Sequence, residues 1–248
     1  MYQYRQQFLD YASLANRATA REIASLLRGS LSIESVVDFG CARGAWLAEW
    51  QSLGVADILG LDGDYVDPNG LLIPPQRFLA RDLHHPIRLN RRFDLVQCLE
   101  VAEHIVAERA PVFIGNLVAH GQIILFSAAP PGQGGDHHVN EQPYEYWRDL
   151  FLRHRFELFD CIRPLIADNP VVNRWYRYNV MLYVHPDAVS RLPQAWLHHR
   201  VGHRDPIEDI SPMVYQIKKG IVRLLPDAVE NGLARLVAGW NASRLPRA

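Results

Sequence analysis

Acidic and imidazole side chains gather in two short segments of the chain, where acid–base or metal chemistry could take place. These segments are residues 99–105, which read LEVAEHI, and residues 127–142, which are rich in proline and glycine. The candidate catalytic or metal-binding side chains in them are Glu100, Glu103, His104 and His138. A histidine with an ordinary pKa of about 6.5 can take a proton from a hydroxyl group at neutral pH. Two carboxylates and two imidazoles could instead hold a divalent cation that polarises such a group.

Simpler explanations exist for the same residues. A loop histidine often bonds a backbone carbonyl and only holds its loop in place. Acidic residues are also favourable near the start of a helix without any metal. We predict that His104 and His138, with Glu103, carry the chemistry. A divalent metal on Glu100, Glu103, His104 and His138 is possible but is not the favoured interpretation.

A strand, a glycine turn and a helix are predicted in residues 35–54, upstream of these groups. The strand and helix are indicated by two sets of apolar residues, Val36, Val37 and Phe39, then Trp46, Leu47, Trp50 and Leu53. Gly40 and Gly44 in the turn would let a ligand approach the backbone, and the first N–H groups of the helix would point at it. This arrangement predicts a nucleotide-type cofactor site.

The glycine spacing in this turn argues against a dinucleotide. That fingerprint needs G-x-G-x-x-G, but here the corresponding positions hold Gly40, Ala42 and Ala45. The observed D-x-G-C-x-x-G instead resembles motif I of the class I S-adenosylmethionine (SAM) methyltransferases, which usually carries a glycine where Ala42 stands. The resemblance implies that SAM is the cofactor.

Two later strands are predicted to end on carboxylates. Asp62 follows the apolar run 58–61 and could accept hydrogen bonds from both ribose hydroxyls, although a solvated turn aspartate would look the same. Asp82 follows the run 78–80 and could accept a hydrogen bond from the adenine amino group. The residues expected to contact the cofactor are Asp38, Gly40, Cys41, Gly44, Asp62, Gly63, Asp82, Leu83 and Leu99.

The alternation of short apolar strands with helical patterns predicts an α/β fold. We expect a Rossmann-like class I methyltransferase sheet of about seven mostly parallel strands, with helices on both faces. The last four expected strands are residues 93–99, 122–127, 156–160 and 175–184. The expected helices include residues 105–119 and 144–153. The predicted domains are an N-terminal helical cap at 1–30, a SAM-binding domain at 31–190 and a C-terminal helical extension at 191–248.

Residues of the last predicted strand and of the C-terminal extension could bind the substrate or form an interface. Alternation in 175–184 would put Arg177 and Asn179 on one face, and together with Asn140 they are candidate substrate-binding residues. In the extension, an apolar stripe runs through Val214, Ile217, Ile221, Leu224 and Leu225. That stripe could dock on the core, roof the acceptor pocket or form a homodimer.

Three segments together resemble a widespread bacterial group of class I SAM-dependent methyltransferases that act on small molecules. They read LEVAEHI at 99–105, DHHVNEQPYEYW at 136–147 and WYRYN at 175–179. His137 departs from the group, where a small residue is usual. The E-x-x-E-H part is also similar to metal-dependent small-RNA 3′-end 2′-O-methyltransferases and to ubiquinone-biosynthesis O-methyltransferases.

Composition narrows the function and the partners. A formal net charge of −1 supplies no basic field for a phosphate backbone, so nucleic acid is not the favoured partner. Three scattered cysteines, no leader pattern and no long apolar stretch predict a cytoplasmic protein without membrane association. We expect methyl transfer to a small-molecule acceptor, on a hydroxyl oxygen of a polar or sugar-like metabolite. The alternatives are a metal-assisted RNA 3′-end 2′-O-methyltransferase and a catalytically silent SAM-binding partner protein.

Overall fold

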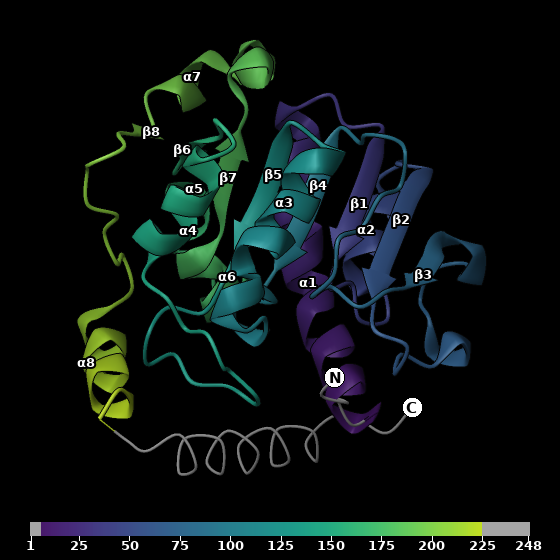
Figure 1. Ribbon diagram of the computed structural model, residues 1–248. Helices are drawn as coiled ribbons and strands as arrows, with labels where there is room; N and C mark the ends of the chain where they lie inside the picture. Colours follow the sequence, from purple (N-terminus) through teal and green to yellow (C-terminus); the bar gives the residue numbers. More distant parts are fainter. Residues whose placement is uncertain (1–5, 225–248) are drawn as a thin grey trace.

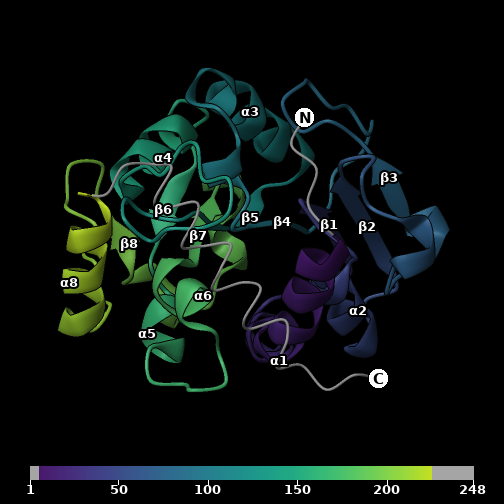
Figure 2. The same ribbon diagram turned by 90° about the horizontal axis from the view of Figure 1, so that it is seen from below.

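The protein folds as a central sheet between two layers of helices (Figures 1 and 2). The computed structural model describes residues 6–224, with side chains described from Asn16 onwards. Within these residues the sheet has eight strands in the order β3-β2-β1-β4-β5-β7-β6-β8. This architecture confirms the predicted mostly parallel α/β sheet with helices on both faces.

Five parallel strands form one half of the sheet. They are β1 (Ser35–Phe39), β2 (Asp57–Asp62), β3 (Phe78–Ala80), β4 (Leu95–Leu99) and β5 (Ile123–Ser127). The strands β4 and β5 are buried along their whole length, as expected where helices cover both faces of a parallel sheet. The carboxyl ends of all five strands lie at one edge, where ligands bind in open α/β sheets.

Three antiparallel strands complete the other half. The strand β7 (Met181–Val184) lies between β5 and β6 (Glu157–Phe159), and β8 (Arg200–Val201) pairs with β6. The predicted C-terminal helical extension, 191–248, contains this short strand β8 in addition to helices, and the domain boundaries stay a prediction. The chain returns to the sheet beyond residue 191.

Helices cover the two faces of the sheet from different parts of the chain. One face carries α1 (Gln6–Ser30), α2 (Ala45–Ser52), α5 (Arg163–Ile166), α6 (Arg174–Asn179) and α7 (Gln194–Leu197). The opposite face carries α3 (Ala110–His120) and α4 (Tyr144–Leu152), as Figure 2 shows. Fully buried Trp50 and Trp147 mark the two cores. The predicted helical cap at 1–30 corresponds to α1, although residues 1–5 lie outside the described part.

The prediction of a strand over 175–184 is wrong in its first half. Residues Arg174–Asn179 form α6, and only Met181–Val184 form a strand. Aromatic residues in alternation favour a strand locally, but here packing decides the conformation. Tyr176 lies edge-on to Trp46 of α2, with ring centroids 5.3 Å apart, and this contact belongs to the helix-covered face. Arg177 and Asn179 therefore do not share the face of a strand.

Short helical turns and a C-terminal helix complete the described chain. The 3₁₀ turns are Pro68–Gly70, Pro75–Arg77, Ala102–His104, Ala107–Arg109 and Pro186–Arg191. The predicted helix at 105–119 thus starts as a 3₁₀ turn and becomes α-helical at Ala110. The last helix, α8 (Met213–Val222), leaves Val214, Ile217 and Ile221 exposed. Leu225 of the predicted stripe lies outside the described residues, and the homodimer stays a prediction. Among the described helices, none combines the length and the apolar character that crossing a bilayer would need.

Candidate active site

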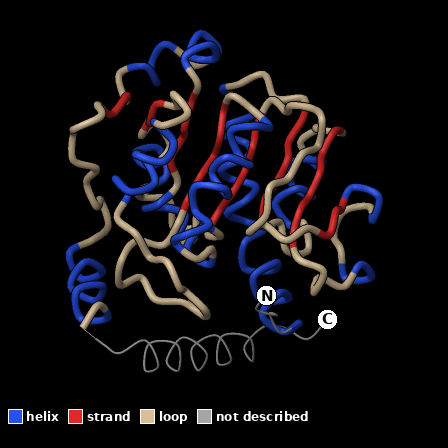
Figure 3. The backbone as a smooth tube through the Cα atoms, in the orientation of Figure 1, coloured by secondary structure: helices blue, strands red, loops and turns tan. Residues whose placement is uncertain are grey.

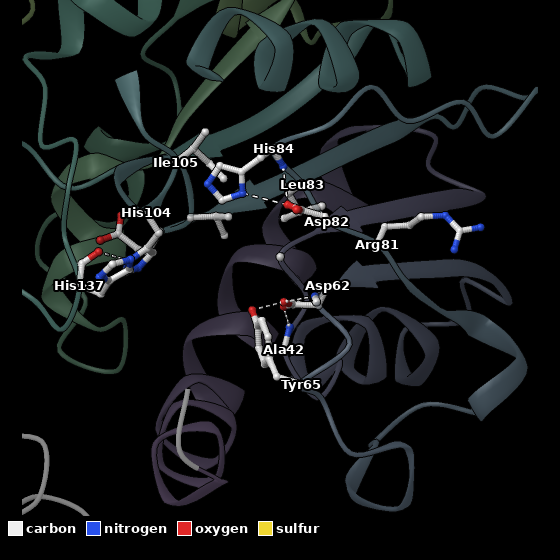
Figure 4. A pocket seen from close by; sticks show the side chains of 14 residues that line it. Ala42, Asp62, Tyr65, Arg81, Asp82, Leu83, His84, His104, Ile105 and His137 are labelled. Carbon is white, nitrogen blue, oxygen red and sulfur yellow. Dashed lines mark hydrogen bonds and ion pairs between the residues drawn. The ribbon is translucent and has the colours of Figure 1, made fainter. Parts of the chain in front are cut away.

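A pocket opens at the carboxyl ends of the parallel strands, where the sequence places the cofactor (Figure 4). It is lined by turns that follow β1, β2, β3 and β4. Five of the predicted cofactor residues line it: Gly40, Asp62, Gly63, Asp82 and Leu83. The structure therefore brings these five residues, from the ends of β1, β2 and β3, into one cavity.

The turn after β1 brings the backbone close to the neighbouring strand end. Gly40 has a φ of +87°, and a Cβ there would lie 2.3 Å from Cγ2 of Val101, so only glycine fits. Ala42, which also lines the pocket, has a φ of 47°, in the left-handed region that costs a residue with a Cβ about 1–2 kcal/mol. The usual glycine of motif I would adopt this conformation without that cost.

Asp62 is held by three donors at the end of β2. Its carboxylate accepts hydrogen bonds from the backbone N–H groups of Ala42 and Gly63, each at 2.7 Å, and from the phenol of Tyr65 (Figure 4). Burial raises the pKa of Asp62, and these hydrogen bonds oppose the rise. A cofactor ribose would therefore share or replace the Tyr65 bond.

Asp82 is engaged by the two histidines that follow it. The backbone N–H of His84 lies 3.0 Å from Oδ1 of Asp82 and the ring Nδ1 lies 2.9 Å away, while Nε2 of His85 lies 3.5 Å from Oδ2. Partial burial raises the pKa of Asp82, but the bonds and charge of these histidines outweigh it and lower the pKa overall. The carboxylate stays ionised and able to accept a further hydrogen bond.

The remaining predicted cofactor residues lie behind the pocket wall. Asp38 is buried, and burial together with the charge of Asp62 raises its pKa to about 8. Cys41 and Leu99 belong to the hydrophobic core, and a Cβ on Gly44 would meet Ile73 at 2.9 Å. None of the four is among the residues that line the described pocket.

Glu103 is the most unusual group beside the pocket. Its side chain is 0 % exposed, and neither carboxylate oxygen has a hydrogen-bond partner among the described residues. Burial raises the pKa of Glu103 well above its usual range, and the charge of Glu100 raises it further, while the nearby backbone N–H groups of Glu103 and Ala129, too poorly placed for ordinary hydrogen bonds, oppose the rise in part. Burying a carboxylate without a hydrogen-bond donor is costly. A bound ligand or ion that contacts the carboxylate of Glu103 would therefore stabilise it.

Two imidazoles face this carboxylate. The ligand atoms of Glu103, His104 and His138 lie within 4.8 Å of one another, and we call these residues the acidic triad. Nδ1 of His104 lies 2.9 Å from the backbone carbonyl of His137. Because a carbonyl can only accept, this Nδ1 carries the hydrogen and Nε2 presents a lone pair. Burial lowers the pKa of His104 to about 3, so the ring is neutral at neutral pH.

Glu100 lines the pocket, as His104 of the triad does, but it belongs to a different group of side chains, and Glu103 and His138 are not among the lining residues. It accepts hydrogen bonds from Gln133 at 2.6 Å and from Asn179 at 3.3 Å. Asn179 also donates to Gln133 and accepts from the hydroxyl of Tyr144. The structure therefore groups three of the four predicted metal-binding residues and ties the fourth into a hydrogen-bonded network.

The other two candidate substrate-binding residues differ in their surroundings. The backbone N–H of Asn140 donates to the carbonyl of Glu103 at 2.9 Å, which places the residue beside the acidic triad. Its buried side-chain nitrogen has no hydrogen-bond partner among the described residues. The guanidinium of Arg177 instead bonds the carbonyl of Val172 at 3.0 and 2.6 Å, and it does not line the pocket.

Several residues of the site carried no functional prediction, and three of them bind predicted residues directly. Tyr65 binds Asp62, Gln133 binds Glu100, and Glu141 binds His138 at 2.7 Å. Tyr65 and Gln133 lie in turns whose sequence shows no spacing that would single them out. Glu141 does have a signal, since it follows His138 by three residues within the HVNEQ segment.

Similar folds occur in solved methyltransferase structures. Magnesium protoporphyrin IX methyltransferase (ChlM) from Synechocystis PCC 6803, with bound SAM, aligns with a TM-score of 0.52 at 18 % identity, covering 75 % of this chain and 86 % of that one. DesVI from Streptomyces venezuelae aligns with a TM-score of 0.52 at 14 % identity, covering 68 % and 92 %. The methyltransferase domain of bacterial CtHen1-C aligns with a TM-score of 0.52 at 16 % identity, covering 69 % and 98 %. No curated protein sequence matches this chain.

The fold and the pocket define a class I SAM-dependent methyltransferase. A family model described as a methyltransferase domain matches residues 5–161, more than half of the chain, and the chain belongs to this family. SAM is accordingly the methyl donor, and Gly40, Asp62 and Asp82, which the sequence predicts to contact it, line the pocket at the strand ends.

Proposed function

We propose that the enzyme transfers the methyl group of SAM to a hydroxyl oxygen of a small polar or sugar-like molecule. The observation that supports this proposal is the acidic triad, in which a buried carboxylate and two imidazoles converge without a donor between them. A second hydroxyl of a polyhydroxylated acceptor, next to the one that is methylated, would supply the hydrogen bond that Glu103 lacks. The motifs at 99–105 and 136–147 support membership in the small-molecule group.

The residues around the triad would act mainly by placement. SAM supplies a methyl group that is already electrophilic, so orientation of the acceptor provides most of the rate, up to roughly 7–11 kcal/mol in favourable cases. Glu103 would hold the acceptor through a second hydroxyl next to the reacting one, and Nε2 of His138 or His104 would take the proton of the reacting hydroxyl, worth roughly 10² to 10⁴ in rate. A pKa of about 3 makes His104 a weak proton acceptor, so we assign this step to His138.

A divalent cation is a second candidate for the triad. Glu103, His104 and His138 offer one carboxylate and two imidazoles, a donor set that suits such an ion, and the unpartnered carboxylate favours it. When bound, the ion would polarise the acceptor hydroxyl. The proton-transfer proposal needs no such ion, so the two can be separated by chelation.

RNA is a weaker candidate for the acceptor. A phosphate backbone is held by several lysine and arginine contacts, and the chain has 26 such residues against 27 acidic ones. The residues that line the pocket include the carboxylates Asp62 and Asp82 and one arginine, Arg81, so the pocket holds no cluster of cations for a phosphate backbone. A small acceptor that is neutral or positively charged fits this site better.

The test combines donor binding with an acceptor screen. We expect calorimetry to show SAM binding that is weakened in Asp62→Asn, and conversion of SAM to S-adenosylhomocysteine with hydroxylated metabolites. Short RNA with a free 3′ end serves as the competing acceptor. SAM binding without turnover on any acceptor would contradict the proposal and favour a catalytically silent partner protein.

We also propose that the enzyme works in the cytoplasm. The three cysteines, Cys41, Cys98 and Cys161, are all unpaired and buried. Unpaired thiols are usual in a reducing compartment. Fractionation of the native cells would test the location.

A further inference from the structure

A carboxylate on the loop after β5 is aimed at His138. Oε1 of Glu141 lies 2.7 Å from Nδ1 of His138 and 2.8 Å from the backbone N–H of Gly134, and Oε2 accepts from the N–H of Gly132 at 2.6 Å. The side chain is 13 % exposed. Glu141 therefore binds three groups of one loop: the backbone N–H groups of Gly132 and Gly134 and the imidazole of His138.

These contacts fix which ring nitrogen of His138 carries the hydrogen. An ionised carboxylate only accepts hydrogen bonds, so Nδ1 must be the donor. In the neutral ring, Nε2 then presents its lone pair, and it lies 4.0 Å from Oε1 of Glu103. Both a proton-accepting role and a cation-binding role at the triad need that lone pair.

Packing holds the ring in the same orientation. The rings of His104 and His138 meet edge-on, with centroids 4.9 Å apart. On another side, a Cβ added at Gly135 would come within 1.9 Å of Nε2 of His138. The imidazole therefore lies against the Gly135 backbone, and the bond to Glu141 sets how the ring is turned.

We propose that Glu141 is a positioning residue that selects the Nδ1–H tautomer of His138 and directs its Nε2 toward the methyl-transfer site. This inference rests on the proposed function. In that reaction the acceptor oxygen bonds the methyl carbon, the carbon–sulfur bond breaks to release S-adenosylhomocysteine, and the hydroxyl proton passes to Nε2 of His138. Glu141 then faces the imidazolium across the Nδ1 bond and stabilises its charge.

The tautomer can be measured without an acceptor. In wild-type protein labelled with ¹⁵N-histidine, we expect His138, assigned by its loss in His138→Gln, to show a protonated Nδ1 and an unprotonated Nε2. A mixture of tautomers, or a hydrogen on Nε2, would overturn the proposal. Because this readout needs no turnover, it stays valid even if the proposed acceptor chemistry fails.

Substitution of Glu141 then tests whether this carboxylate selects the tautomer of His138. In Glu141→Gln the amide nitrogen can donate to Nδ1, so we expect the hydrogen to move to Nε2 and kcat to fall by roughly 10² to 10⁴, with little change in SAM affinity. Glu141→Asp keeps the charge and should retain the tautomer and most of the activity. The matched control is Glu145→Gln, because Glu145 also accepts a backbone N–H, that of Ile207 at 3.0 Å, but does not contact the triad.

A purely structural role for Glu141 predicts a different pattern. If the carboxylate only ties Gly132 and Gly134 together, Glu141→Gln would lower the melting temperature while the folded fraction keeps the wild-type tautomer and kcat. That result would overturn the proposal. If Glu141→Gln does not fold, the wild-type spectrum and the Glu141→Asp variant still show whether Glu141 selects the tautomer of His138.

Discussion

The phenol of Tyr65 donates a hydrogen bond to Oδ1 of Asp62, the carboxylate at the end of β2 that is expected to bind the ribose of SAM. The same oxygen accepts the N–H of Gly63, and the other oxygen accepts that of Ala42. Tyr65 therefore occupies a bonding position on Asp62 that a ribose hydroxyl could use.

Removing this phenol should favour the cofactor. We expect Tyr65→Phe to bind SAM more tightly, because the ribose no longer competes for Asp62, by up to the roughly 1.5–3 kcal/mol of a hydrogen bond to a charged group. The free energy of unfolding without SAM should fall by a similar amount. Calorimetry and thermal unfolding measure the two effects, and weaker SAM binding would show that Tyr65 contacts the cofactor directly.

A glycine at position 42 should relieve strain in the turn after β1. Ala42 has a φ of 47°, so we expect Ala42→Gly to leave SAM affinity equal or improved and stability unchanged or higher by up to about 1 kcal/mol. The control is Ala48→Gly within α2, which should destabilise by about 1 kcal/mol, because glycine is unfavourable in a helix. Weaker SAM binding in Ala42→Gly would argue against this placement of the turn.

Removing metal ions with a chelator should distinguish the two proposed roles of the acidic triad, proton transfer to His138 and binding of a divalent cation. We expect methyl transfer to continue after exhaustive treatment with a chelator, because His138 accepts the proton. Glu103→Gln weakens a hydrogen bond to the acceptor, worth roughly 1.5–3 kcal/mol, and should lower kcat/KM by roughly 10- to 100-fold, whereas Glu108→Gln on the exposed turn nearby should not. A rate that is lost with the chelator and restored by Mg²⁺ or Mn²⁺ would instead identify a metal-assisted enzyme.

The stability of the cofactor-free protein should fall as pH rises. The pKa of Asp38 is raised from 3.8 to about 8 by burial and by Asp62, so the folded protein keeps a proton that the unfolded chain releases. The contribution of this proton to the free energy of unfolding is complete below about pH 4. It declines as pH rises and is gone above about pH 8.

Neutralising Asp38 should remove that dependence. We expect Asp38→Asn to gain melting temperature relative to wild type between pH 5 and pH 8, by at least the 2–4 °C that about 1 kcal/mol produces in a domain of this size. Differential scanning calorimetry without SAM measures it. Parallel pH profiles for the two proteins would contradict a raised pKa at Asp38.

Local patterns predicted the parallel half of the sheet and its ligand edge. The apolar runs before Asp62 and Asp82 are short and bounded by turn residues, so each run alone identifies a strand. The run before Asp62 is mostly buried, whereas the run before Asp82 forms the edge strand β3 and stays half-buried or exposed. Residues 174–179 show where this logic fails. Their aromatic alternation favours a strand, but the contact between Tyr176 and Trp46 and the bonds of Asn179 to Gln133 and Tyr144 depend on distant segments.

The sequence by itself indicated a nucleotide-type cofactor site, because a strand, a glycine turn and two later carboxylates are local patterns, and the resemblance of that turn to motif I identified the cofactor and the class of reaction. The sequence also named Glu103, His104 and His138. Only the tertiary structure separated Glu100 from these three, left Glu103 buried without a donor and turned Nε2 of His138 toward it. Burial and hydrogen bonding depend on which segments pack together, and segments some 35 residues apart at 103 and 138 meet only once the sheet has formed.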